Sequence, residues 1–187
     1  MKYADWTIGE FLERVGSTQL TPSGGAVAAI GGALGAALCE MVCAHTDDEP
    51  LAESAAQVAT CRERLLDLAD EDAAAVRTFQ DAQTAVDTGT VDAEQEPRTA
   101  RQRLLDVPVR IAETCLVVVE WTTRVLADAN PRTVADGVTG ALLAHAALQA
   151  AVHTARTNSD GNEATRDRLA TIEADAAAAL QEINRRW

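Results

Sequence analysis

Residues 21–42 read TPSGGAVAAIGGALGAALCEMV, a stretch dominated by glycine and alanine. The turn formers at its start predict a loop that opens into a helix over 26–45. Gly31, Gly32 and Gly35 lie inside that helix, where each glycine costs about 1 kcal/mol relative to alanine. Three interior glycines therefore indicate that a neighbouring element packs very closely against this backbone.

The remaining segments also show helical spacing of their apolar residues. They predict helices over 6–15, 51–86, 98–129, 134–158 and 163–187. The polar segments 87–96 and 159–162 are expected to be a long loop and a turn, and Pro108 is expected to interrupt and kink its helix. No segment shows the alternation of a strand. We therefore predict an all-α fold, an antiparallel bundle of long helices with no sheet, as a single domain over 1–187.

The charge balance of the 187-residue chain is strongly acidic, since 29 acidic residues face 16 basic ones for a formal net charge of −13. Nucleic acids and anionic membrane surfaces both require cationic contacts, so both are excluded as partners. A dense carboxylate surface keeps a protein hydrated at high salt, and we interpret the acid excess as adaptation to a salty cytosol. A GC-rich genome would explain why Lys2 is the only lysine, but not the acid excess.

Nothing at the N-terminus has the apolar core of a signal peptide, and the most apolar run, 24–39, is shorter than the roughly 20 residues of a spanning helix. We therefore expect a cytoplasmic protein with reduced cysteines. Cys39 and Cys43 lie one turn apart, but no second pair at zinc spacing exists, and His145 and His153 are two turns apart. We predict packing cysteines, no metal site and no cofactor.

Asp72 is the most informative residue by its spacing. It follows Leu65 and Leu68 by seven and four residues and precedes Val76 and Phe79 by four and seven, so its carboxylate falls inside the apolar stripe of the helix. Desolvation raises the pKa of such a carboxylate toward neutrality, which suits a general acid/base. The spacing is equally consistent with a core aspartate that pairs with an arginine or caps a kink.

The loop over 17–25 is a second candidate, because Pro22, Ser23, Gly24 and Gly25 lead directly into a helix. Free N–H groups and the helix dipole make such an entry a cradle for an anion or a carbonyl group. An ordinary cap, with Ser23 as the N-cap residue and glycines for the bend, fits these residues at least as well.

Two further polar residues have plain structural interpretations. Asp136 lies just inside the helix over 134–158, where a carboxylate stabilises the helix start through the dipole. Asn158 lies near the end of the same helix, where asparagine is a common C-terminal cap.

Five segments, in this order, resemble the formiminotransferase-cyclodeaminase and methenyltetrahydrofolate cyclohydrolase family. They are TIGEFLERVGS at 7–17, TPSGGAVAAIGGALGAALCEMV at 21–42, LLDLADEDAAAV at 65–76, VPVRIAETC at 107–115 and TVADGVTGALLAHAALQAA at 133–151. The resemblance implies an all-helical bundle that forms homodimers and takes a folate-type small-molecule substrate, a one-carbon adduct of tetrahydrofolate.

The resemblance also assigns residues. Asp72 falls on the family's acid/base aspartate, and Asp136 falls on the aspartate of its Ser-Asp pair. Asn158 falls on the second asparagine of an Asn-Val-x-x-Asn stretch, and the family's glycine-rich loop falls on Pro22-Ser23-Gly24-Gly25. We therefore expect Asp72 to be catalytic and the others to bind substrate.

Several positions depart from the family pattern. Ser23 replaces a glycine, Ala135 replaces the serine of the pair, and Thr154 stands where the first asparagine is expected. The family's Leu-Pro-Lys loop is not recognisable over 84–91, and loss of that lysine would weaken recognition of an anionic folate tail.

The reaction that the resemblance implies is hydrolysis of 5,10-methenyltetrahydrofolate to 10-formyltetrahydrofolate. The nearest alternative is the formiminotetrahydrofolate cyclodeaminase reaction, in which 5-formiminotetrahydrofolate cyclises with loss of ammonia. A free-standing domain favours the hydrolase. A non-catalytic scaffold or ligand-binding protein of the same fold is an alternative from another class, and the departures from the family pattern favour it.

Overall fold

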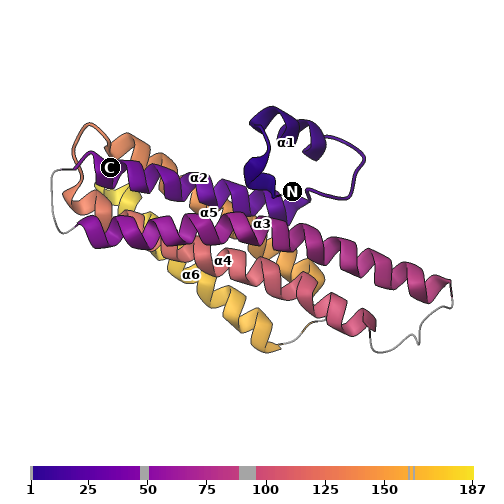
Figure 1. The fold of residues 1–187 in the computed structure, drawn as a ribbon. Helices are drawn as coiled ribbons and strands as arrows, with labels where there is room; N and C mark the ends of the chain where they lie inside the picture. The colour runs from indigo at the N-terminus through magenta and orange to yellow at the C-terminus, as the bar shows by residue number, and fades with distance from the viewer. Residues whose placement is uncertain (1, 47–50, 89–95, 160, 162) are drawn as a thin grey trace.

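A computed structural model describes residues 2–46, 51–88, 96–159, 161 and 163–187 (Figure 1). The elements in chain order are the short 3-10 helix η1 (Tyr3–Asp5), α1 (Ile8–Val15), α2 (Gly24–Ala44), α3 (Leu51–Asp87), α4 (Glu96–Asp128), α5 (Val134–Asn158) and α6 (Glu163–Arg186). The described ranges contain no strand, so the predicted all-α class is confirmed. Residues 89–95 of the predicted loop, and 160 and 162 of the predicted turn, lie outside the described residues.

Five long helices form the bundle. α2 packs against α3 and α5, and α4 packs against α3, α5 and α6 (Figure 1). The pair α3 and α4 runs antiparallel, because Arg110 binds Glu71 while Arg101, earlier on α4, lies over the ring of Phe79, later on α3. This arrangement agrees with the bundle that the sequence predicts.

The glycines of α2 allow a close contact with α5. A Cβ atom added at Gly35 would lie 2.6 Å from the carbonyl oxygen of Gly140, and one added at Gly140 would lie 2.8 Å from the carbonyl oxygen of Gly35. On another side of α2, a Cβ atom at Gly32 would lie 2.5 Å from Cys115 Sγ. The predicted close approach is therefore confirmed, and it joins the backbones of α2 and α5.

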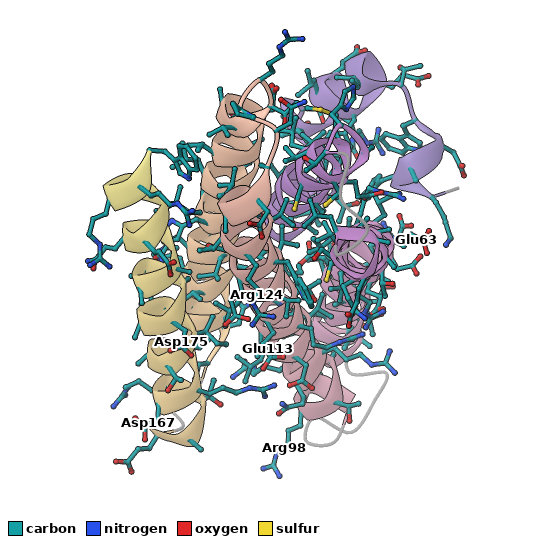
Figure 2. The ribbon with its side chains drawn as sticks, turned by 90° about the vertical axis from the view of Figure 1, so that its left-hand side faces the viewer. Glu63, Arg98, Glu113, Arg124, Asp167 and Asp175 are labelled. Carbon is teal, nitrogen blue, oxygen red and sulfur yellow. The ribbon has the colours of Figure 1, made fainter. Side chains whose placement is uncertain are left out.

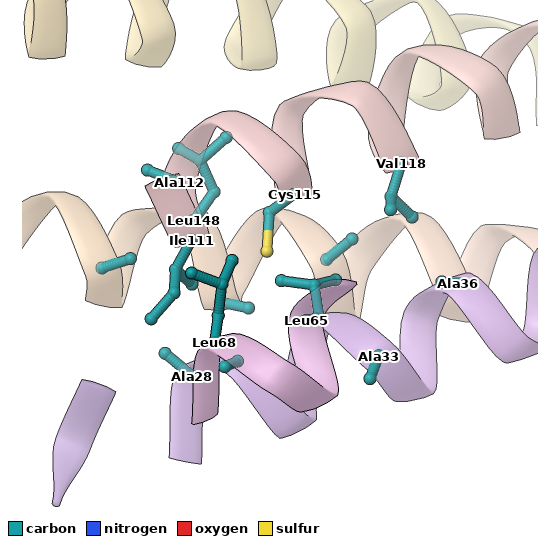
Figure 3. Packing of buried hydrophobic residues seen from close by; sticks show 14 of the residues in the cluster. Ala28, Ala33, Ala36, Leu65, Leu68, Ile111, Ala112, Cys115, Val118 and Leu148 are labelled. Carbon is teal, nitrogen blue, oxygen red and sulfur yellow. The ribbon is translucent and has the colours of Figure 1, made fainter. Parts of the chain in front are cut away.

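The core is built from small and branched aliphatic side chains (Figure 3). Leu65 and Leu68 of α3 share one fully buried cluster with Ile111 and Cys115 of α4. Burial raises the pKa of the Cys115 thiol well above its ordinary value, which favours a packing role for this cysteine. Because each small side chain buries little area, close helix contact over a long distance supplies the burial instead.

The predicted helix ends agree with the structure within two residues, and three details differ from the prediction. Gly24 and Gly25 form the first turn of α2 rather than the end of the loop, because Ser23 is the extended N-cap residue. The helix α4 continues through Pro108, which is buried, so the expected interruption is wrong: packing outweighs the hydrogen bond that proline removes. The first α-helix begins at Ile8, two residues later than predicted.

The N-terminal segment leaves the bundle and returns to it. At its start Lys2 pairs with Asp67, and the backbone N–H of Tyr3 donates to Asp70 Oδ1 at 3.0 Å, so η1 is fixed to α3. Helix α1 then stands apart from the other helices, in indigo in Figure 1, and the chain rejoins them at Ser23.

Helix α2 has 21 residues, more than the apolar run that the sequence predicts, and by length and composition alone it is sufficient to cross a membrane. Of its most apolar 18-residue window, 56% is buried inside the fold, as in the core helix of a bundle. The predicted cytoplasmic location stays a prediction.

Among the described residues Asp72 is the only charged residue that is buried, and other charged side chains lie partly or fully on the outside of the bundle. Figure 2 shows Glu63 of α3 and Asp167 of α6 directed away from the helices, and both are exposed. Adaptation of this surface to high salt stays a prediction.

Candidate active site

The candidate site is centred on Asp72, whose residue surface is only 4% exposed. Its Oδ2 accepts two hydrogen bonds, one from Ser23 Oγ at 2.6 Å and one from the backbone N–H of Ala26 at 3.0 Å. Both donors belong to the start of α2, whereas Asp72 lies near the middle of α3. The carboxylate and the glycine-rich loop, which the sequence offers as separate candidates, therefore form one site.

Gly25 gives the Asp72 carboxylate its room. A Cβ atom at position 25 would lie 2.1 Å from Asp72 Oδ1 and 2.6 Å from Cγ, far inside van der Waals contact. Gly24 differs, since a Cβ atom there would meet no heavy atom within 4 Å. Gly25 is thus needed to seat the carboxylate, and Gly24 faces open space beside it.

Burial raises the pKa of Asp72 above its ordinary value, because the charged form loses its hydration. The hydrogen bonds from Ser23 and Ala26 oppose this change, since they stabilise the anion. Within the described part of the chain no basic side chain pairs with Asp72, so the alternative of an arginine-paired core aspartate does not hold there. Oδ1 receives no hydrogen bond from the described residues, so both hydrogen bonds to the carboxylate are on Oδ2.

The ordinary-cap interpretation of Ser23 is right in position and wrong in bonding. Ser23 is the N-cap residue of α2, but its side chain makes no capping hydrogen bond, because the hydroxyl donates to Asp72 instead. The acidic neighbours of Asp72 have other partners: Asp70 binds the backbone of η1, and Glu71 binds two arginines. The helix start and its serine therefore serve the carboxylate. Pro22, the remaining loop residue of the predicted set, is buried.

Asn158 lies at the same end of the bundle as Asp72. Gly31 of α2 faces Ala147 of α5, since a Cβ atom at Gly31 would lie 3.8 Å from Ala147 Cβ, and α5 runs on from there toward the start of α2. At the end of α5 Asn158 Nδ2 donates to the carbonyl oxygen of Leu104 at 2.7 Å. Asn158 thus links α5 to α4 near the site, without a direct hydrogen bond to Asp72.

Asp136 lies at the opposite end of the bundle from Asp72. Its neighbour Gly137 faces Val42 of α2, which is 17 residues beyond Gly25. At 1.5 Å per residue this separation is about 25 Å along the helix. The structure of one chain therefore brings Asp72, the loop and Asn158 to one end, and it does not bring Asp136 to them.

The departures from the family pattern fall at both ends. Thr154 Oγ1 donates to the carbonyl oxygen of Ala150 within α5, so this side chain is occupied by its own helix. Ala135 is exposed beside Asp136. The position expected for the Leu-Pro-Lys loop, 84–91, lies partly outside the described residues.

Two residues beside the loop were not predicted. Arg77 Nη1 donates to Thr21 Oγ1 at 3.2 Å, which places a guanidinium next to the loop. The indole N–H of Trp6 is buried without a hydrogen-bond partner among the described residues, and Trp6 lines an open hollow of about 580 Å³ with Glu10 and Arg14. Arg77 follows Asp72 by five residues, so the sequence alone places it about one turn further along α3. Its contact with Thr21 depends on the path of the loop and could not be predicted from the sequence.

No group of three or more histidine, cysteine, aspartate or glutamate side chains among the described residues is arranged to hold a metal ion. The absence of a metal and of a cofactor in the reaction stays a prediction.

The fold is an all-helical bundle, and its candidate site is a buried carboxylate held at a glycine-rich helix start. The chain belongs to the formiminotransferase-cyclodeaminase family, whose model matches residues 7–178. It is 28% identical to the methenyltetrahydrofolate cyclohydrolase of Methylorubrum extorquens, over 83% of this chain and 80% of that protein. Its fold is similar to the crystal structure of formiminotetrahydrofolate cyclodeaminase from Thermotoga maritima, with a TM-score of 0.86 and 23% identity over 97% of this chain and 96% of that one.

Proposed function

We propose that this chain hydrolyses 5,10-methenyltetrahydrofolate to 10-formyltetrahydrofolate, with Asp72 as the general acid/base. The observation that carries the proposal is the Asp72 carboxylate itself, which is buried, has no basic partner among the described residues and is held by two donors on one oxygen. Membership of the family and the likeness to a cyclohydrolase support the choice of substrate.

The chemistry needs one group that first takes a proton and then returns it. Water adds to the electrophilic carbon between N5 and N10 while Asp72 Oδ1 accepts a proton from the water. The bond from that carbon to N5 then breaks as Asp72 returns the proton to N5, and the hydroxyl group of the adduct releases its remaining proton to solvent, which leaves the formyl group on N10. A carboxyl group with a raised pKa suits both steps, because it exchanges protons closer to neutral pH. Its negative form also stabilises the cationic substrate.

The chain acts as a homodimer in this proposal, and α2 and α5 offer the surface for it. Within the described chain the charged residues of α2 and α5 are Glu40, Asp136 and Arg156, and Glu40 and Arg156 pair with neighbouring helices. The face that these helices turn away from the core is largely apolar, with Thr139 and His153 as exposed polar residues of α5. It includes Val27, Ile30, Leu34, Leu38, Leu143 and Ala146.

Self-association through this α2/α5 face follows from charge and size. Two copies that each carry a net charge of −13 repel one another unless their uncharged faces meet. The face is roughly 30 Å long, from the length of α2, and about 20 Å wide for two adjacent helices. Both copies together then bury on the order of 1,000 Å², which reaches the range of specific interfaces.

Purified chain is incubated with methenyltetrahydrofolate, and loss of its near-ultraviolet absorbance is followed from low to molar salt. The proposal predicts faster loss than in buffer, with the largest rate at high salt. In a parallel reaction with 5-formiminotetrahydrofolate, growth of the same absorbance with release of ammonia would instead identify the cyclodeaminase reaction. No acceleration of either reaction at any salt concentration would identify a non-catalytic scaffold.

A further inference from the structure

We propose that Arg77 binds the carboxylate tail of the folate substrate and gives the enzyme a preference for substrates that carry this tail. The tail is the glutamate that follows the p-aminobenzoyl ring, and it bears carboxylates at its α and γ positions. The inference rests on the proposed function, from which it takes the folate derivative. It adds a substrate contact that lies outside the acid–base chemistry of Asp72.

The charge of the chain makes a cationic contact valuable for such a substrate. The net charge is −13, and a surface of one sign repels an anionic ligand. A guanidinium beside the site offsets this repulsion locally, and its paired N–H donors match the geometry of a carboxylate. The side chain to look for is therefore a basic one next to the site that no carboxylate of the chain already holds.

Arg77 stands out among the basic side chains by its lack of a carboxylate partner beside the loop. Six others among the described residues form ion pairs with carboxylates, namely Lys2, Arg62, Arg64, Arg110, Arg156 and Arg168. Arg77 forms no ion pair with any described residue. Asp81 lies four residues further along α3, a spacing at which opposite charges can meet, yet the guanidinium turns to the loop instead.

The position of Arg77 suits the tail rather than the reacting carbon. Its Nη1 donates to Thr21 Oγ1 at 3.2 Å, and Ser23, two residues further along the same loop, donates to Asp72 Oδ2 at 2.6 Å. Along α3, Arg77 lies five residues beyond Asp72, which is about 7.5 Å along the helix axis. The p-aminobenzoyl ring separates the reacting carbon from the glutamate, so a cation that binds the tail must lie to one side of Asp72, as Arg77 does.

The contact with Thr21 leaves most of the guanidinium available. Only Nη1 has a hydrogen-bond partner among the described residues, so Nε and Nη2 present an open edge to a carboxylate. Thr21 is neutral, and it therefore holds the guanidinium in place without cancelling its charge. A side chain that is already held loses less freedom when it binds a ligand. Arg77 is also exposed, so a tail can reach it from solvent.

The test compares two substrates that differ only in the tail, at the lowest salt concentration at which the chain is folded. One is 5,10-methenyltetrahydrofolate, and the other is its analogue in which a neutral methylamide replaces the glutamate. Arg77→Gln removes a hydrogen bond to a charged group, so kcat/KM for the folate should fall at least about 10-fold. The contact binds ground state and transition state alike, so kcat should not change, and neither should kcat/KM for the methylamide. An equal loss for both substrates, or no loss for the folate, would overturn the proposal.

Three further variants separate recognition of the tail from support of the loop and from net charge. Arg77→Lys keeps the charge but loses the paired donors, so its loss for the folate should be smaller than that of Arg77→Gln. Thr21→Val removes the acceptor of Arg77 without a change of charge, and it should also cost less than Arg77→Gln. Arg166→Gln makes the same change in net charge at an exposed position of α6, a helix that packs on α4 and α5, and it should affect neither substrate. A Thr21→Val or Arg166→Gln protein that reproduces the full loss would overturn the proposal.

A binding measurement keeps this inference separate from the proposed function. The Kd of p-aminobenzoyl-triglutamate, which is the tail without the reacting ring system, is measured by calorimetry for the unaltered chain and for Arg77→Gln. The unaltered chain should bind it at least about 10-fold more tightly, and a chain that binds it no better than the variant does would overturn the tail contact. Tight binding through Arg77 without turnover of either folate derivative would overturn the proposed function alone. Turnover of methenyltetrahydrofolate that Arg77→Gln leaves unaltered would overturn the tail contact alone.

Discussion

Replacement of Gly25 by alanine is the smallest change that should displace the proposed catalytic group. The new Cβ atom would lie 2.1 Å from Asp72 Oδ1, whereas ordinary contact begins at 3.4 Å, so the carboxylate must retreat by about 1.3 Å. Gly25 does not have a positive φ angle, so the backbone accepts alanine without strain. Alanine in a helix is also about 1 kcal/mol better than glycine, and the fold is expected to persist.

The retreat has two consequences. It breaks or stretches the hydrogen bonds to Asp72 from Ser23 and Ala26, each of which contributes about 1.5–3 kcal/mol because the acceptor is charged. It also moves the acid/base group off its position, and a displacement of 1 Å can cost about 100-fold in rate. We therefore expect Gly25→Ala to lose about 100-fold in kcat/KM for methenyltetrahydrofolate.

The assay is the loss of substrate absorbance, run beside a thermal melt of the same protein. Gly9→Ala is the matched control, because a Cβ atom at Gly9 meets only Thr7 Oγ1, at 4.0 Å, on the exposed helix α1. Unaltered kcat/KM in the Gly25→Ala protein, with its fold intact, would refute the argument that this carboxylate needs the space.

Three further outcomes follow from the same structure. Ser23→Ala removes a donor that lowers the pKa of Asp72, so that pKa rises further and the acid limb of the kcat/KM–pH profile moves to higher pH; an unmoved limb would contradict this. Gly35→Ala places a Cβ atom 2.6 Å from the Gly140 carbonyl oxygen, so it should lower the free energy of unfolding by about 1–3 kcal/mol in a urea titration. Gly31→Ala, the control, should not lower it, and equal effects of the two substitutions would contradict the packing account. The Tm should rise from low to molar KCl as the repulsion within a net charge of −13 is screened, and a steady fall would remove the argument for salt adaptation.

The helical fold could be predicted from the sequence because the spacing of the apolar residues and the helix propensities of the segments agree. Apolar spacing placed five long helices, and the interior glycines of α2 predicted a close neighbour, which proved to be α5 at Gly35 and Gly140. The continuity of α4 through Pro108 was not readable. The sequence rule for proline considers only the lost hydrogen bond. In the fold, the packing of α4 on both sides of the buried Pro108 also contributes to its stability.

The site was readable in part. Spacing placed Asp72 on the buried face of α3, and the turn formers placed a loop before α2, but no local pattern showed that the two meet. Their contact joins residues 49 positions apart, and it depends on how α2 and α3 align. Asp136 illustrates the other limit, since the spacing within its own helix does not show that the structure places it at the opposite end of α2 from Asp72.

The central claim is that Asp72 moves the proton in the reaction, and Asp72→Asn tests it most directly. Asparagine keeps the shape of the side chain but cannot act as the base, and it avoids the burial of a charge, so the variant should fold at least as well as the unaltered chain at neutral pH. The single-turnover rate with methenyltetrahydrofolate, measured at molar salt, should fall by about 100- to 10,000-fold, with Tm unchanged or higher. A folded Asp72→Asn protein whose rate lies within a few-fold of the unaltered chain would contradict the account.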